Sequence, residues 1–201
     1  MPDINVAVVY YSATGSVHRL AEALAEGATK AGAEVRLRRV KELAPDSAID
    51  ANPAWREHLE ASRDIPEATL DDLVWGHAYA FGTPTRFGLM ASQLKQFMDT
   101  TGGLWSEGIL ADKPVTGFTS AVNPNGGLET TIVSMYHVFQ HWGSIIVPPG
   151  YTDPVLHAAG GNPYGISWPT GQAGELPDDE VLNAASYQGN RLVDIARRLQ
   201  G

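Results

Sequence analysis

The stretch VVYYSATGSVHRLAEALAEGA, residues 8–28, predicts a buried strand that passes through small hydroxylated residues into a helix. Such a helix start favours an anion, because its backbone N–H groups are unpaired and the helix dipole is positive there. The stretch lacks both the G-x-G-x-x-G turn of dinucleotide-binding proteins and the Gly-Lys-Ser/Thr ending of the nucleoside-triphosphate loop. Its loop supplies hydroxyls on Ser12, Thr14 and Ser16, with Gly15 and no lysine. We therefore expect a phosphate monoester held by hydroxyls and backbone, with simple capping of the helix as the alternative.

Bulk composition narrows the class of protein. The chain has 201 residues, of which 43% are hydrophobic, so we expect a single domain over residues 1–201. No run approaches the roughly 18 apolar residues of a membrane helix, so membrane insertion is not expected. The net charge of −9 disfavours nucleic acid as a partner and favours a small molecule. The absence of cysteine permits a reduced, cytoplasmic location.

Strands and helices are predicted to alternate along most of the chain. Apolar β-branched runs predict strands, and apolar residues at helical spacing predict helices. The expected strands lie at residues 4–12, 33–40, 74–84, within 113–127 and at 143–151; the expected helices lie at 17–31, within 87–103, at 130–141 and at 178–199. Residues 41–70, with three prolines, are expected to be a loop with one short helix near residues 55–62. The alternation predicts an α/β fold with a parallel sheet and helices on both faces.

Three loops follow the carboxyl ends of the first, third and fourth expected strands. They are Ser12–Val17, Thr83–Gly88 and Ser120–Gly127. A parallel sheet binds its ligand beyond those ends, where the strand order reverses, so we expect the loops to converge. In the second loop, backbone groups held by Pro84 can bind the edge of a flat polar heterocycle beside Arg86 and Phe87, although the loop taken alone favours an ordinary turn.

The sequence leaves two alternative roles for each of two further side chains, Trp105 and His141. Trp105 follows two glycines in TTGGLW, residues 100–105, where an indole can stack on an aromatic ligand or fill a core. His141 ends the expected helix at 130–141, where the helix dipole favours histidine in any case. The six histidines show no metal-ligand spacing, and FTSAV is not the G-x-S-x-G motif of hydrolases. We therefore expect neither a metal site nor a nucleophilic serine.

Several motifs in a fixed order indicate a family. They are YYSATGSV (10–17), FGTPTRFG (81–88), TGGLW (101–105), the glycine-rich loop that ends at Gly127, and HWGSIIVPPGY (141–151). With the later GNPYG and YQG, the chain resembles the WrbA family of FMN-dependent NAD(P)H:quinone oxidoreductases over nearly its whole length. The resemblance implies a flavodoxin-like three-layer fold with a five-stranded parallel sheet in the order 2-1-3-4-5.

The resemblance also implies the site residues. The implied FMN-binding residues are Ser12, Ala13, Thr14, Gly15, Ser16 and Val17 around the phosphate, Pro84, Thr85, Arg86 and Phe87 along the flavin ring, and Ser120, Asn125, Gly126, Gly127 and His141 on its other side. It implies Trp105 and Thr14 at the substrate pocket. In the mechanism that we expect, His141 is the catalytic group that stabilises or protonates the developing hydroquinone. The chain departs from the family at Thr14, where tyrosine is common, and in SAVNPNGG (120–127), which is one residue longer.

The expected reaction is the two-electron reduction of a quinone in two alternating steps. NAD(P)H passes a hydride to bound FMN and leaves, and the quinone then takes its place. The resemblance further implies a homotetramer whose sites are completed by neighbouring subunits. Two alternatives stay open: an electron-carrying flavodoxin that docks on protein partners, and a flavin-free scaffold of the same fold. No residue in the sequence separates NADH from NADPH as the donor.

Overall fold

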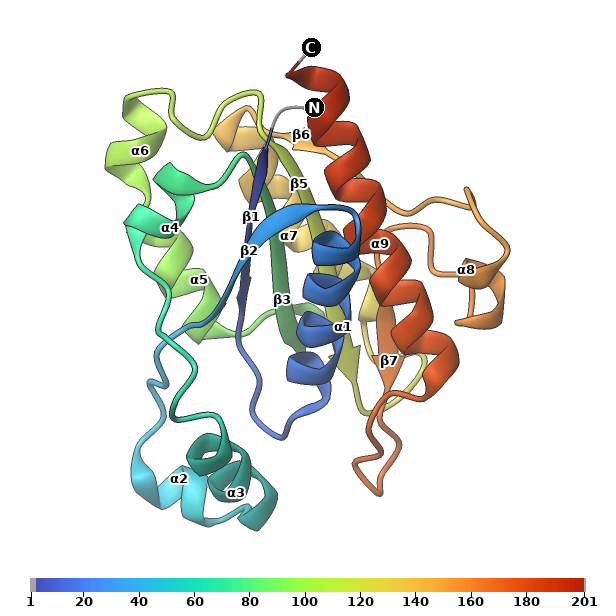
Figure 1. Ribbon diagram of the computed structural model, residues 1–201. Coiled ribbons are helices and arrows are strands. Elements are labelled where there is room, and N and C mark those ends of the chain that lie inside the picture. The colour runs from blue at the N-terminus through green and yellow to red at the C-terminus, as the bar shows by residue number, and fades with distance from the viewer. Residues whose placement is uncertain (1–2, 201) are drawn as a thin grey trace.

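A computed structural model describes residues 3–200 as a parallel sheet between two layers of helices (Figure 1). The strands are β1 (Ile4–Tyr10), β2 (Ala33–Arg39), β3 (Ala78–Arg86), β4 (Leu89–Met90), β5 (Pro114–Ala121), β6 (Ile145–Ile146) and β7 (Ser167–Pro169). The helices are α1 (Ser16–Lys30), α2 (Asp46–Asp50), α3 (Pro53–Ala61), α4 (Leu70–Trp75), α5 (Ser92–Asp99), α6 (Gly102–Ser106), α7 (Leu128–Trp142), α8 (Val155–Ala158) and α9 (Asp179–Leu199).

The sheet runs in the order β2-β1-β3-β5-β6, with parallel pairing along this path. Because β5 and β6 are the fourth and fifth strands of the predicted count, this confirms the expected order 2-1-3-4-5. The expectation of one domain over residues 1–201 stays a prediction, since Met1, Pro2 and Gly201 lie outside the described residues.

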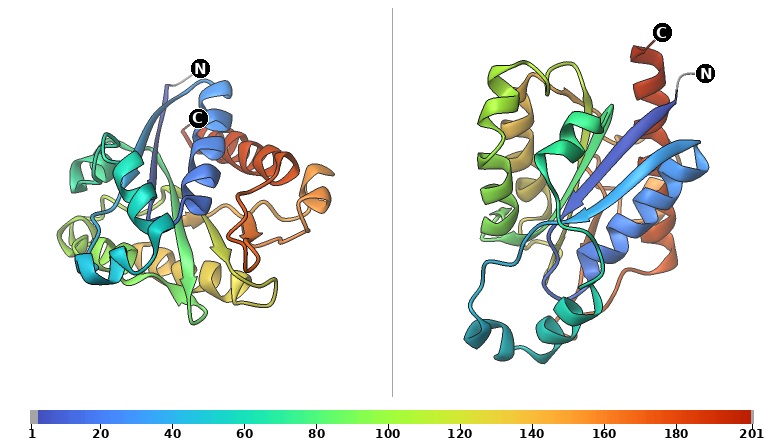
Figure 2. Two further views of the ribbon diagram at one scale, coloured as in Figure 1. Left: turned by 90° about the horizontal axis from the view of Figure 1, so that it is seen from below. Right: turned by 60° about the vertical axis from the view of Figure 1, so that its left-hand side comes forward.

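Strand β1 is buried on both faces, as its nearly continuous apolar run predicts. Val6 and Val8 pack in the core under α1 and α9, whereas Ala7 and Val9 pack in the core on the other face, with α5 and α7. Figure 2 shows these helix pairs on opposite sides of the sheet. The alternation along β1 fixes its register, because a shift of one residue would exchange the two cores.

Helices α1 and α9 approach each other closely through two glycines. A Cβ on Gly27 would lie 1.9 Å from the carbonyl oxygen of Ser186, and one on Gly189 would lie 2.1 Å from that of Leu24. Only glycine allows this backbone contact. Within residues 3–200, no helix combines the length and the hydropathy needed to cross a lipid bilayer.

The region before β3 differs from its prediction. Residues 41–70 form two short helices, α2 and α3, rather than a loop with one. The strand expected at 74–84 begins only at Ala78, because Val74 lies in α4. Thr69 and Asp72 start α4 as a capping box, in which the Asp72 carboxylate accepts hydrogen bonds from the Thr69 N–H and hydroxyl at 3.0 and 2.9 Å.

The fifth strand is divided into two pieces. Strand β6 pairs with the start of β5 and β7 pairs with its end, so the strand expected at 143–151 is mostly absent. Pro148 and Pro149 lack the N–H that a continuing ladder needs. In the interval, the side chain of Gln188 on α9 donates to Gly117 O (2.9 Å) and Thr116 Oγ1 (2.6 Å) and accepts from Ile166 N (2.9 Å). The excursion 147–166 then returns to the carboxyl edge through β7.

Candidate functional site

The predicted loops converge on one pocket at the carboxyl edge of the sheet. It has a volume of about 280 Å³. Residues predicted for the site supply most of its wall: Ser12, Ala13, Thr14, Ser16, Val17, Pro84, Thr85, Arg86 and Ser120. The sequence did not predict the other lining residues, which are Asn52, Trp55, Ala121, Val122 and Thr170. The carboxyl ends of β1, β3 and β5, with the turns that follow them, therefore form a shared cavity, as the topology requires. Residues 83–86 still belong to β3 and Ser120 to β5, so the loops predicted at Thr83–Gly88 and Ser120–Gly127 begin later than expected.

The loop after β1 leaves a buried hydroxyl unpaired at the start of α1, among the described residues. Gly15 precedes α1 with φ 99°, and no side chain caps the helix. The Ser12 hydroxyl accepts a hydrogen bond from the Gly15 N–H at 3.1 Å. The Ser16 hydroxyl is buried, with the residue 3% exposed, and it has no hydrogen-bond partner among the described residues. A buried unpaired hydroxyl at the positive end of a 15-residue helix fits a phosphate oxygen.

Threonine hydroxyls fix the end of β3 and the turn that follows it. The Thr85 hydroxyl accepts from Gly88 N at 3.2 Å and from the Thr131 hydroxyl at 2.8 Å, which ties this loop to α7. The Arg86 guanidinium donates to Thr85 O at 2.9 Å. Phe87 has φ 55° and a fully exposed side chain, so it does not line the pocket of this chain.

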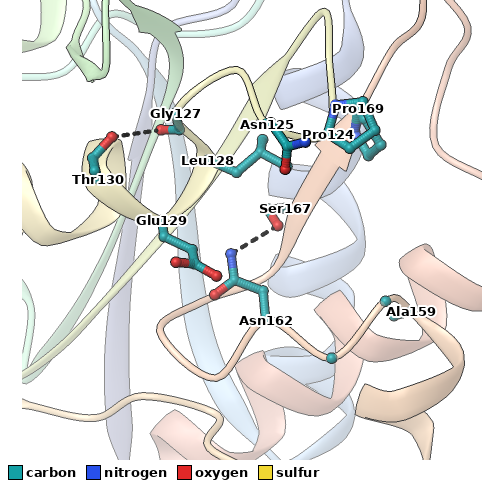
Figure 3. A pocket seen from close by; sticks show the side chains of 12 residues that line it. Pro124, Asn125, Gly127, Leu128, Glu129, Thr130, Ala159, Asn162, Ser167 and Pro169 are labelled. Atoms are coloured by element: carbon teal, nitrogen blue, oxygen red, sulfur yellow. Dashed lines mark hydrogen bonds between the residues drawn. The ribbon is translucent and has the colours of Figure 1, made fainter.

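The loop after β5 contributes to two cavities. Ser120 lines the first pocket, whereas Asn125 and Gly127 line a second cavity of about 440 Å³ between the start of α7 and residues 159–169, as Figure 3 shows. The Gly126 N–H closes the turn by donating to Asn123 O at 2.9 Å. A Cβ on Gly127 would lie 2.8 Å from the Gly88 Cα, so this glycine lets the second and third loops touch.

Trp105 and His141 lie far from the pocket within one chain. They contact each other: the Trp105 indole N–H donates to His141 O at 2.8 Å. His141 ends α7, which runs back from the carboxyl edge and spans about 20 Å at 1.5 Å per residue. Both residues therefore sit at the amino edge of the sheet. Their predicted roles at the flavin need a second subunit and stay predictions.

Residues 41–70, for which the sequence predicted a loop with one short helix but no site residue, form a further wall of the pocket. Trp55 on α3 lines it and donates its indole N–H to the Glu42 carboxylate at 3.0 Å. Tyr11 and Gln93 donate to the same carboxylate, both at 2.8 Å. Burial alone would raise the pKa of Glu42, but these bonds and that from the Ala44 N–H outweigh it and lower the pKa.

The sequence gives little indication that Glu42 and Trp55 form this wall. Glu42 and Trp55 lie 13 residues apart in the chain and are polar or aromatic residues in a proline-rich segment, which carries no periodic pattern. Only the fold brings them together with Tyr11, which continues the first strand. Trp55 lies in the short helix predicted near residues 55–62, but nothing in the sequence indicated Glu42 as its partner.

Comparisons with known proteins agree with this geometry. Residues 4–153 match the model of a family described as NADPH-dependent FMN reductase. A protein of Deinococcus radiodurans named NAD(P)H dehydrogenase (quinone) is 46% identical over 198 residues, which are 98% of each chain. A protein of the same name from Geobacter sulfurreducens is 42% identical over 98% of this chain and 100% of its own.

The solved structures agree as well. The crystal structure of a WrbA-like flavodoxin from Agrobacterium tumefaciens has a TM-score of 0.69 and 25% identity, and the match covers 98% of this chain and 99% of that one. The chain belongs to the WrbA family. This confirms the resemblance drawn from the motifs, with the flavodoxin-like fold of that family.

The pocket of this WrbA-family chain fits FMN by its own chemistry. The unpaired Ser16 hydroxyl and the lysine-free loop suit a phosphate monoester, and the loop of Pro84 and Thr85 supplies backbone groups beside it. The described residues contain no group of three or more histidines, cysteines, aspartates and glutamates placed to hold a metal ion. The pocket is lined by hydroxyls and backbone, with the side chains of Asn52, Trp55 and Arg86.

Proposed function

We propose that this protein is an FMN-dependent NAD(P)H:quinone oxidoreductase in which NAD(P)H and the quinone occupy one site in turn. FMN and NAD(P)H follow from its family, and the quinone from the names of the relatives. The observation that carries the proposal is the single pocket that joins the unpaired Ser16 hydroxyl to the loop of Pro84 and Thr85. A cytoplasmic location, expected from the lack of cysteine, is part of the proposal.

The residues of the chain position the cofactor and keep water away. When bound, FMN accepts a hydride from NAD(P)H and passes two electrons to the quinone. Ser12, Ser16 and the first turn of α1 hold the phosphate. Thr85, fixed by Thr131, holds the backbone beside the ring. Trp55 covers one side, and its bond to Glu42 keeps it there.

Initial-rate kinetics test the order of the steps. Apoprotein is loaded with FMN, and NADH or NADPH oxidation is followed at several benzoquinone concentrations. Alternate occupancy of one site gives parallel double-reciprocal lines. Intersecting lines would show that both substrates bind together and would contradict the proposal. Reduction by NAD(P)H without quinone turnover would instead indicate an electron carrier, and failure to bind FMN would indicate a flavin-free scaffold.

We also propose that the active assembly is a homotetramer in which a neighbouring subunit supplies Trp105 and His141. Two features support this: Trp105 is 56% exposed on α6, and both residues lie at the amino edge, opposite the pocket. A large exposed indole suits an interface or an aromatic ligand. Phe87, which is fully exposed beside the pocket, also suits burial by a second copy.

Mixed assemblies test the shared site. Trp105→Ala removes the indole, and Ser16→Asp places a negative charge where the phosphate binds. Each variant alone is expected to lose most quinone reductase activity. Co-refolded variants should regain part of it, because the Ser16→Asp subunit supplies Trp105 to an intact pocket of its neighbour. No recovery in assemblies shown by light scattering to be mixed would contradict a shared site.

A further inference from the structure

We propose that His58, carried by α3, is an additional ligand of the FMN phosphate and binds it as the protonated imidazolium. This inference rests on FMN occupying the pocket described above. It concerns a residue of the 41–70 segment for which neither a motif nor a role was expected from the sequence.

The position of His58 places its ring against the phosphate loop. Its Nδ1 lies 3.6 Å from the point where a Cβ on Gly15 would stand. His58 and Ser12 also line the same small cavity behind the loop. Within residues 3–200 the His58 ring makes no hydrogen bond. An imidazole without a partner therefore faces the glycine that begins the anion site.

The neighbouring histidine is already engaged. The His18 ring lies 5.3 Å from the His58 ring, centroid to centroid. Its Nδ1 is 2.7 Å from the Tyr10 hydroxyl, and its Nε2 is 3.3 Å from the Glu22 carboxylate. Because both nitrogens of His18 have partners, His58 is the imidazole that remains available to a ligand.

Other charged groups near the two rings are paired. On α1, Arg19 bonds to Glu22 at 2.9 Å. On β2, Arg39 lies 3.2 Å from Glu67 and donates to Ile65 O. The Glu42 carboxylate, which follows β2, accepts hydrogen bonds from Tyr11, Trp55 and Gln93. Arg86 lines the pocket on the side of β3 and donates to the Thr85 carbonyl. In this lysine-free loop, His58 is the group behind Gly15 that can add a positive charge by taking up a proton.

Protonation and phosphate binding are therefore linked. Burial, and next the nearby His18, lower the pKa of His58 to about 4, with Glu22 opposing them. The ring is neutral at pH 7 without phosphate. A bound dianion stabilises the imidazolium and raises its pKa, so FMN binding takes up a proton and FMN affinity rises as the pH falls.

Flavin titrations of the apoprotein at pH 8 and pH 5.5 test this. If phosphate returns the His58 pKa to the ordinary value near 6.5, the affinity of wild type gains about ten-fold between these pH values relative to His58→Asn. Comparison at equal pH cancels protonation of the phosphate itself. The control His157→Asn changes an exposed histidine on α8 and should behave as wild type. Riboflavin lacks the phosphate, so its affinity should be the same for His58→Asn and for wild type.

The proposal would be overturned if FMN binding had the same pH dependence in wild type and in His58→Asn. It would also be overturned if His58→Asn lost as much affinity for riboflavin as for FMN. Proton NMR of wild type gives a second measurement that does not depend on the variant's folding. The His58 ring signal should titrate near pH 4 in the apoprotein and well above it with FMN. A titration unchanged by FMN would also overturn it. Turnover of NAD(P)H in the same samples reports separately on the proposed reaction.

Discussion

Replacing Ser16 by alanine is expected to stabilise the apoprotein and weaken FMN binding, two effects of opposite sign. The hydroxyl is buried and has no partner among the described residues, so the apoprotein carries its desolvation cost. Such a cost is about 1–3 kcal/mol, and its removal should raise the melting temperature of a chain this size by a few degrees, at about 2–4 °C per kcal/mol.

The loss on the FMN side follows from the charge of the phosphate. A hydrogen bond to a charged group contributes about 1.5–3 kcal/mol, so Ser16→Ala should raise the FMN dissociation constant about 10- to 100-fold. Riboflavin affinity should be unchanged. Thr29→Ala is a matched control on the same helix, because the Thr29 hydroxyl donates to Ala25 O in the last turns of α1, away from the loop.

Thermal melts of apoprotein and fluorescence titrations with FMN and riboflavin measure both effects. A lower melting temperature of the apoprotein would mean that the Ser16 hydroxyl is already satisfied. An FMN dissociation constant within two-fold of wild type would mean that the phosphate does not bind at this hydroxyl. Either result would refute the argument from the unpaired donor.

The remaining predictions concern packing and the Glu42 network. Gly189→Ala places a methyl group 2.1 Å from Leu24 O and should lower the free energy of unfolding by about 3 kcal/mol in urea denaturation, whereas Gly102→Ala, with no atom within 4 Å, should change it by less than about 0.5 kcal/mol. A smaller loss in Gly189→Ala would mean that α1 and α9 separate easily. Glu42→Gln should cost about 1–3 kcal/mol at pH 7, because Tyr11 and Trp55 lose a charged acceptor. The pKa of Glu42 is lowered in the folded chain, so this difference should shrink as the pH falls below about 4, and a difference independent of pH would argue against the charge.

Much of the fold was predictable because its signals are local. The apolar run of β1 and the helical spacing of α1 identify one strand and one helix from a few residues each. The split fifth strand was not predictable, since Ser167–Pro169 is three residues long and becomes a strand only by pairing with Thr119–Ala121. Similarly, Val74 has the character of a strand residue, and only the Thr69 capping box assigns it to α4.

The candidate site also contains residues that could be predicted from the sequence and residues that could not. The three loops could be predicted, because parallel strands must end at one edge and glycine, serine and threonine mark each end. The wall of Trp55 and the position of His58 could not, because they depend on the Glu42 contacts and on how α3 folds back onto the first loop. Trp105 was predicted near the ring by resemblance, yet it lies at the opposite edge of the chain, so its place depends on assembly.

The side-chain amide of Gln188 protects an open edge of the sheet. Between β6 and β7 the middle of β5 has no neighbouring strand on that side, and an open strand edge can recruit another chain and aggregate. Gln188 occupies that edge from α9, so the middle of β5 needs no strand from the segment 147–166 to satisfy its backbone there. Insertions into the exposed turns of this segment are therefore not expected to uncover the edge of β5.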